Sequence, residues 1–227
     1  GGYKVPVVNG GYKALRSYLL ASLEECLSEL NLTVVGGRTG VAKTALLNQA
    51  YETFRLPVVD LEGLAHHRGS AFGKRAGSQP TQINFENRIA IELLKLRASG
   101  YQQVMMEDES RLIGRCALPL TLQDKLRGAP LVMLEASLED RVHHSWENYI
   151  LSNYREQITL CNSDEVAFTA FADSLRLSLG NIRKRLGGAR YQELSKVLEA
   201  ALLAHQQGDP EPHKQWIEVL LRDYYDP

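Results

Sequence analysis

Long apolar runs, paired cysteines and an excess of charge of one sign are all missing from this sequence of 227 residues. No run approaches the ~18 apolar residues that a membrane-spanning helix needs, and no secretory signal is evident. Its three cysteines, Cys26, Cys116 and Cys161, have neither C-x-x-C spacing nor a histidine partner at metal-ligand spacing. The net charge of −1 excludes a uniformly basic nucleic-acid-binding protein but allows a local basic patch. We therefore expect a soluble cytoplasmic protein with reduced, mostly buried thiols.

The most informative segment is a glycine-rich turn between an apolar run, Leu32–Val35, and a helical pattern. The turn consists of Gly37, Arg38, Thr39, Gly40, Val41, Ala42, Lys43 and Thr44. A strand, a glycine-rich turn and a helix are the context of a P-loop, whose backbone N–H groups and helix N-terminus cradle phosphate oxygens. Lys43 adds a point charge, and the Thr44 hydroxyl is placed to hold Mg²⁺. The segment therefore predicts a phosphate-binding site.

The match to the P-loop pattern G-x-x-x-x-G-K-[ST] is incomplete, because Ala42 stands where the second glycine belongs. Glycine is preferred where the backbone approaches a ligand closely or adopts a conformation that a Cβ disfavours. We expect the methyl group of Ala42 to crowd the phosphate or distort the loop. An ordinary glycine turn remains the alternative interpretation.

Apolar runs alternate with helical patterns up to about residue 150, which predicts a parallel sheet with helices on both faces. The predicted strands are Leu32–Val35, Pro57–Leu61, Val104–Glu107 and Leu131–Glu135. The predicted helices are Lys43–Phe54, Gln82–Ala98, Leu118–Leu126 and Leu138–Ile150. The fold class is thus α/β, a P-loop NTPase-like domain over residues 31–150.

Both flanks of this domain differ from it. Residues 1–30 predict one short strand, Val5–Val8, and a helix from Lys13 to Leu30. Residues 151–227 predict a helical subdomain, because apolar residues recur at spacings of three and four. Its expected helices lie near Ser152–Thr159, Ser163–Leu179, Arg190–Gln207 and His213–Tyr225. We interpret Trp216, Tyr224 and Tyr225 as helix-packing residues.

Acidic residues follow two of the predicted strands, at the sheet edge where ligands of such folds bind. Asp60-Leu61-Glu62 follows the second strand, and Glu107-Asp108-Glu109 follows the third. Beside a P-loop, a carboxylate after an apolar strand holds Mg²⁺ directly or through water. We predict Thr44 with Glu107 or Asp108 as the metal ligands, the alternative being a solvated strand end.

Two further segments carry positive charge. The long connection from Gly63 to Pro80 contains Arg68 and Ser70, and predicts a lid over a phosphate, an RNA contact, or only a solvated loop. A second group surrounds a glycine turn and predicts tRNA contact, although a solvated face has the same pattern. This group contains Arg176, Arg183, Lys184, Arg185 and Arg190.

Several of these motifs together resemble the tRNA 2-selenouridine synthase family. They are Gly10-Gly11-Tyr12-Lys13-Ala14-Leu15, the P-loop segment, the run from Asp60 to Gly73, and the run from Glu107 to Gly114. The family pairs an N-terminal rhodanese domain with a C-terminal P-loop domain. The resemblance implies that this chain is the second domain, preceded by the final strand and helix of the first, and that the rhodanese cysteine is absent from it.

The resemblance further implies a transferase that acts on the wobble uridine in the anticodon of certain tRNAs. Selenophosphate supplies selenium to replace the sulfur of 2-thiouridine, and geranyl diphosphate forms an S-geranyl intermediate. Arg68, Ser70 and Arg111 are implied as further phosphate contacts, and without the rhodanese cysteine we expect no complete selenation by this chain. Two alternatives remain: a P-loop kinase or NTPase that uses ATP, and a non-catalytic RNA-binding module with a vestigial P-loop.

Overall fold

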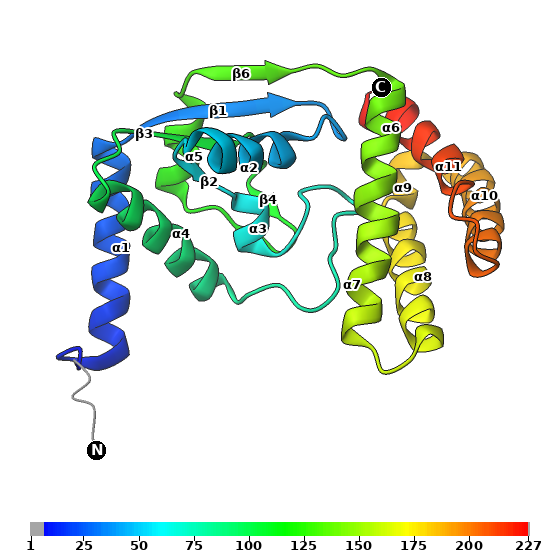
Figure 1. Ribbon diagram of the computed structural model, residues 1–227, viewed down its shortest axis with the longest axis horizontal. Coiled ribbons are helices and arrows are strands. Elements are labelled where there is room, and N and C mark those ends of the chain that lie inside the picture. The colour runs from blue at the N-terminus through cyan, green and yellow to red at the C-terminus, as the bar shows by residue number, and fades with distance from the viewer. Residues whose placement is uncertain (1–6, 227) are drawn as a thin grey trace.

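Four parallel strands form the central sheet of the computed structural model, which describes residues 7–226 (Figure 1). Their order is β2-β3-β1-β6, so β1 lies between two neighbours. The strands are β1 (Asn31–Gly37), β2 (Val58–Val59), β3 (Gln103–Glu107) and β6 (Leu131–Leu134). The register pairs Val35 with Glu107 and Gly37 with Leu134. The end of β1, and with it the glycine-rich turn, is therefore central on the carboxyl edge of the sheet.

Helices flank this sheet, as the alternating pattern predicts. α1 (Gly11–Glu29), α4 (Gln82–Ala98) and α5 (Leu120–Arg127) share one apolar core with the strands, whereas α2 (Lys43–Phe54) packs on β1, β2 and β3. Side chains such as Leu23, Phe85 and Met106 fill this core and are almost wholly buried. The α/β P-loop fold expected from the sequence is confirmed. Coverage is incomplete at β6, an edge strand whose Leu131 and Met133 are exposed.

The second core is helical and extends from the loop residue Phe72 to Leu221. Its elements are α6 (Leu138–Trp146), η1 (Glu147–Ser152), α7 (Asn153–Leu160), α8 (Asp164–Asn181), α9 (Arg183–Leu186), α10 (Gly188–Gln206), α11 (His213–Leu220) and η2 (Leu221–Tyr225). α6, η1 and α7 follow one another without a break, as one long helical rod beside the α/β part (Figure 1). The boundary expected at residue 150 falls inside this rod.

Several local expectations need correction. The second predicted strand is short, because Asp60 accepts a hydrogen bond from the Gly63 N–H at 2.6 Å and so begins a helix, α3 (Leu61–Ala65). The short hairpin of β4 (Leu112–Ile113) and β5 (Cys116–Ala117) was not predicted. Of the predicted strand Val5–Val8, residues 5 and 6 lie outside the described range, and residues 7 and 8 are not in a strand. In the described range, no helix is long and apolar enough to cross a bilayer.

Candidate functional site

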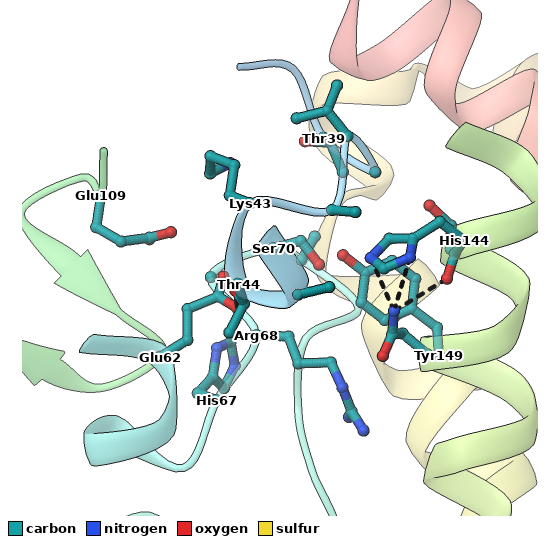
Figure 2. A pocket seen from close by; sticks show the side chains of 18 of the residues that line it. Thr39, Lys43, Thr44, Glu62, His67, Arg68, Ser70, Glu109, His144 and Tyr149 are labelled. Carbon is teal, nitrogen blue, oxygen red and sulfur yellow. Dashed lines mark hydrogen bonds between the residues drawn. The ribbon is translucent and has the colours of Figure 1, made fainter. Parts of the chain in front are cut away.

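The carboxyl edge of the sheet opens on a cavity of about 660 Å³. One wall consists of the glycine-rich turn and the acidic strand ends. The opposite wall comes from the helical part, with His144 of α6 and Tyr149 of η1 facing the turn (Figure 2). Ser70, from the connection that follows α3, lies between the two walls (Figure 2). A ligand in this cavity would therefore contact both parts of the chain.

The glycine-rich turn is a P-loop in its geometry. Residues 39–44 line the cavity, and Lys43 donates a 3.3 Å hydrogen bond to the Gly37 carbonyl. Gly40 has a φ of +87° and lies so close to α6 that a Cβ would stand 2.8 Å from Ser145 Oγ. Glycine is therefore required at position 40, on grounds of both conformation and space.

Ala42 adopts the left-handed conformation, with φ 65° and ψ 34°, directly before α2. The loop therefore has the backbone conformation that suits glycine, and Ala42 bears backbone strain. This conformation costs an L-residue about 1–2 kcal/mol. Of the other turn residues, Arg38 points to solvent and pairs with Asp226 at 3.3 Å instead of lining the cavity.

The acidic groups are arranged differently from the predicted metal ligands. Thr44 Oγ1 donates to Glu62 Oε2 at 3.0 Å, so Glu62 is the carboxylate nearest the predicted Mg²⁺ ligand. Glu109 and Asp108 also line the cavity, whereas Glu107 is fully buried outside its lining and accepts a 3.0 Å hydrogen bond from the Leu61 N–H. Glu62 was detectable in the sequence as part of the acidic segment after the second strand, but its orientation was not.

The pKa values of three carboxyl groups at this edge are raised. Burial, with repulsion from Glu109, raises the pKa of Glu62 to about 8. Burial, with repulsion from Asp60 and Glu62, raises the pKa of Glu107 to about 8. Burial also raises the pKa of Glu109 to about 7, despite the opposing charge of Lys43. One Glu107 oxygen, Oε1, is buried without a hydrogen-bond partner among the described residues.

This donor set suits Mg²⁺, because a nearby cation favours ionised carboxylates and so opposes the burial and repulsion that raise these pKa values. No three acidic, histidine or cysteine side chains within residues 7–226 converge tightly enough to chelate an ion by themselves. Mg²⁺ usually retains water and takes one or two carboxylates together with substrate phosphates. Thr44, Glu62, Asp108 and Glu109 line the cavity and could supply such ligands.

The connection after α3 is fixed to the helical part. Arg68 donates to Glu156 at 3.0 Å, and Arg75 donates to the same carboxylate at 2.6 Å. Both arginines line the cavity, as does Ser70. Arg68 Nη1 and Ser70 Oγ are buried and have no hydrogen-bond partner in the part of the chain that the structure describes. The segment for which the sequence allowed a lid, an RNA contact or a solvated loop thus lines the cavity and presents polar groups to it.

The end of the helical part braces the P-loop. Arg141 of α6 is buried, donates from Nε to the Thr39 carbonyl at 2.8 Å and forms two hydrogen bonds to Asp226, at 2.5 and 3.0 Å. Nearby, the Tyr225 hydroxyl accepts a 3.2 Å hydrogen bond from the Ala71 N–H. Tyr224 and Tyr225 pack against the helical core, as the sequence predicts, and they also line the cavity.

The residues of the predicted basic group differ in their surroundings. Arg176 is engaged by Glu199 at 2.7 Å and by Asp173 at 3.1 Å. Arg183, Lys184, Arg185 and Arg190 are all exposed, and Arg185 also lines the P-loop cavity. Arg111, the remaining predicted phosphate contact, is exposed and does not line the cavity.

Comparison with known proteins identifies the family of this chain. The family model described as the tRNA 2-selenouridine synthase AAA domain matches residues 30–227. The chain is 53% identical over 229 residues to the tRNA 2-selenouridine synthase of Hahella chejuensis, covering 100% of this chain and 58% of that protein. It is 50% identical over 227 residues to that of Pseudomonas syringae pv. syringae, with 100% and 60% covered.

The chain therefore spans about three fifths of the length of these relatives. A solved DNA replication initiation factor aligns with 96% of this chain and 74% of its own at 16% identity, but the TM-score of 0.29 is too low to inform the site. The family model covers the P-loop, the acidic edge and the helical wall alike, and the chain belongs to the tRNA 2-selenouridine synthase family.

Proposed function

We propose that this chain is the diphosphate-binding part of an enzyme that converts wobble 2-thiouridine of tRNA to 2-selenouridine through S-geranyl-2-thiouridine. The observation that carries the proposal is the cavity in which the P-loop, Lys43 and the acidic edge meet the helical wall. The relatives of this chain bear the name tRNA 2-selenouridine synthase, and this name supports the selenouridine product. Since they are longer, the complete enzyme would include an N-terminal rhodanese domain that supplies the cysteine for selenium transfer.

The geranyl step explains why such an enzyme needs a P-loop. The thiocarbonyl sulfur attacks C1 of geranyl diphosphate, a C–S bond forms, and the C–O bond breaks with its electron pair on the departing diphosphate. The N3–H proton of the thiouridine is lost to water, which leaves the neutral S-geranyl product. Backbone N–H groups of residues 38–44 and the Lys43 ammonium would stabilise the charge that develops on the leaving group. Selenophosphate, the other phosphorylated substrate, would use the same donors if it is the ligand held here.

Bound Mg²⁺ would neutralise part of the diphosphate charge. Thr44, Glu62 and Glu109 would hold it, with Asp108 at the same edge. The chain's own contribution is to orient these groups: Gly69 leaves room that Glu62 and Glu109 occupy, since a Cβ there would stand 2.5 Å from Glu62 Oε1 and 2.8 Å from Glu109 Oε1.

Exposed Arg183, Lys184 and Arg190 would contact the tRNA backbone, in a cytoplasmic enzyme.

Calorimetric titration with geranyl diphosphate and with ATP, both with Mg²⁺, tests the proposal. We expect geranyl diphosphate to bind more tightly than ATP, and Lys43→Ala to weaken it by about tenfold to a hundredfold, as for loss of a charge-assisted contact. Lys196→Ala removes an exposed lysine of α10 outside the cavity and should leave affinity unchanged. Preference for ATP together with a phosphorylated product would replace the proposal by the kinase alternative.

A further inference from the structure

Four cationic side chains line the P-loop cavity, and three of them are already engaged. Lys43 binds the Gly37 carbonyl, and Arg68 and Arg75 share the Glu156 carboxylate. The fourth, Arg185, comes from α9 of the helical part. Within residues 7–226, the Arg185 side chain forms no ion pair and no hydrogen bond, so its charge remains available to a ligand.

A tyrosine pair holds Arg185 at the cavity. Its guanidinium carbon lies 4.8 Å from the centroid of the Tyr224 ring, and Tyr224 meets Tyr225 edge to face at 4.9 Å. The Tyr225 hydroxyl itself accepts a hydrogen bond from the N–H of Ala71, in the connection that follows α3. Stacking uses the face of the guanidinium and leaves the N–H donors in its plane free for a bidentate acceptor such as a phosphate.

We propose that Arg185 binds a phosphate group of the same ligand that the P-loop holds, reaching it from the helical wall. The inference rests on the proposed function, since it requires a diphosphate in this cavity. It changes the role that the sequence suggested for Arg185 from RNA contact to small-ligand contact. The ligand class is a diphosphate or a longer phosphorylated chain, whose two ends are held by two parts of the protein.

Arg183 offers a matched comparison two residues away. It lies on the same helix and also stacks on a tyrosine, with its guanidinium carbon 5.2 Å from the Tyr191 ring centroid. It does not line the cavity. Arg183 and Arg185 therefore differ in the surface they face, while charge, helix and aromatic support are the same.

The test is calorimetric titration of this chain with inorganic diphosphate and Mg²⁺, for the parent and for Arg185→Gln, Arg183→Gln, Arg185→Lys and Lys43→Ala. We expect Arg185→Gln to raise the Kd about tenfold and Arg183→Gln to change it less than about twofold. Arg185→Lys should recover part of the affinity, because it keeps the charge but not the planar fork. Equal melting temperatures of the two glutamine variants would show that a folding defect is not the cause.

A second arm measures tRNA binding of the same variants at several salt concentrations, because a lost backbone contact reduces the salt dependence. The inference is overturned if Arg185→Gln leaves diphosphate affinity unchanged, or if it weakens tRNA binding alone. Lys43→Ala separates the two proposals. If Lys43→Ala abolishes diphosphate binding and Arg185→Gln has no effect, this inference alone fails. If neither variant affects binding, the P-loop proposal fails as well.

Discussion

The two walls of the cavity are built in opposite ways. The P-loop wall comes from consecutive residues, 39–44, and the donors that such a turn offers to a phosphate are chiefly backbone N–H groups. The helical wall collects single side chains, among them His144, Tyr149, Arg185 and Tyr225, from elements far apart in the sequence. Local backbone geometry therefore determines the first wall, whereas packing of the helical core determines the second.

The difference matters for what each wall can recognise. A backbone cradle suits any phosphate, because its donors do not depend on side-chain identity beyond the glycines and Lys43. The opposite wall carries aromatic rings, hydroxyls and a cation, and so has the groups that can distinguish one phosphorylated substrate from another. We expect specificity to reside mainly in the helical wall.

The largest expected loss of stability comes from breaking the Arg141–Asp226 pair that braces the P-loop. Asp226→Ala removes the carboxylate that pairs with Arg141, whose side chain is 4% exposed, and should lower the free energy of unfolding by about 3 kcal/mol. Urea denaturation measures this. Asp223→Ala is the control, because Asp223 pairs with Arg222, which is 56% exposed, and its loss should cost less than about 1 kcal/mol. Equal costs for the two variants would contradict a bracing role for Asp226.

The acidic edge of the P-loop wall should make stability depend on pH. Folded Glu62, Glu107 and Glu109 have pKa values of about 8, 8 and 7, above the value of 4.5 for an unburied glutamate. The folded state therefore keeps protons that the unfolded state has lost, and the free energy of unfolding should fall as pH rises from about 5 to about 8. We expect a decrease of about 2 kcal/mol over this range, because these coupled groups do not titrate independently.

Urea denaturation at several pH values, with and without Mg²⁺, measures this slope. Mg²⁺ should reduce it, and Glu62→Gln should flatten it, since the amide carries no proton that can be lost. Glu193→Gln, at an exposed position of α10, serves as the control. A flat profile for the unchanged chain would show that the three carboxyl groups do not interact as their positions imply.

The smallest expected change in the free energy of unfolding comes from replacing Ala42 in the P-loop. Ala42→Gly should raise the free energy of unfolding by about 1 kcal/mol, because it removes the strain of a left-handed alanine. It should also tighten diphosphate binding. Ala50→Gly, within α2, should instead destabilise by about 0.5–1 kcal/mol, as glycine does inside helices. A loss of stability on Ala42→Gly would contradict the strain at this position.

Much of the α/β part follows from local patterns in the sequence. Apolar runs gave three of the four strands nearly to their ends, and α2 and α4 begin and end where the helical pattern does. The second strand was predicted too long, because a capping interaction of Asp60 competes with extension of the strand. That competition involves one side-chain hydrogen bond, which periodicity does not record.

The sequence by itself determined the P-loop, the parallel sheet and the acidic strand ends, because each depends on neighbouring residues and their backbone preferences. Only the tertiary structure decided which groups face the ligand: Glu62 and Glu109 line the cavity while Glu107 is buried beneath it, and Arg185 points into it while Arg183 does not. The same holds for the Arg141–Asp226 brace, whose partners are 85 residues apart. Orientation and distant pairing arise where the helical part meets the P-loop and the connection after α3, through contacts that no local pattern contains.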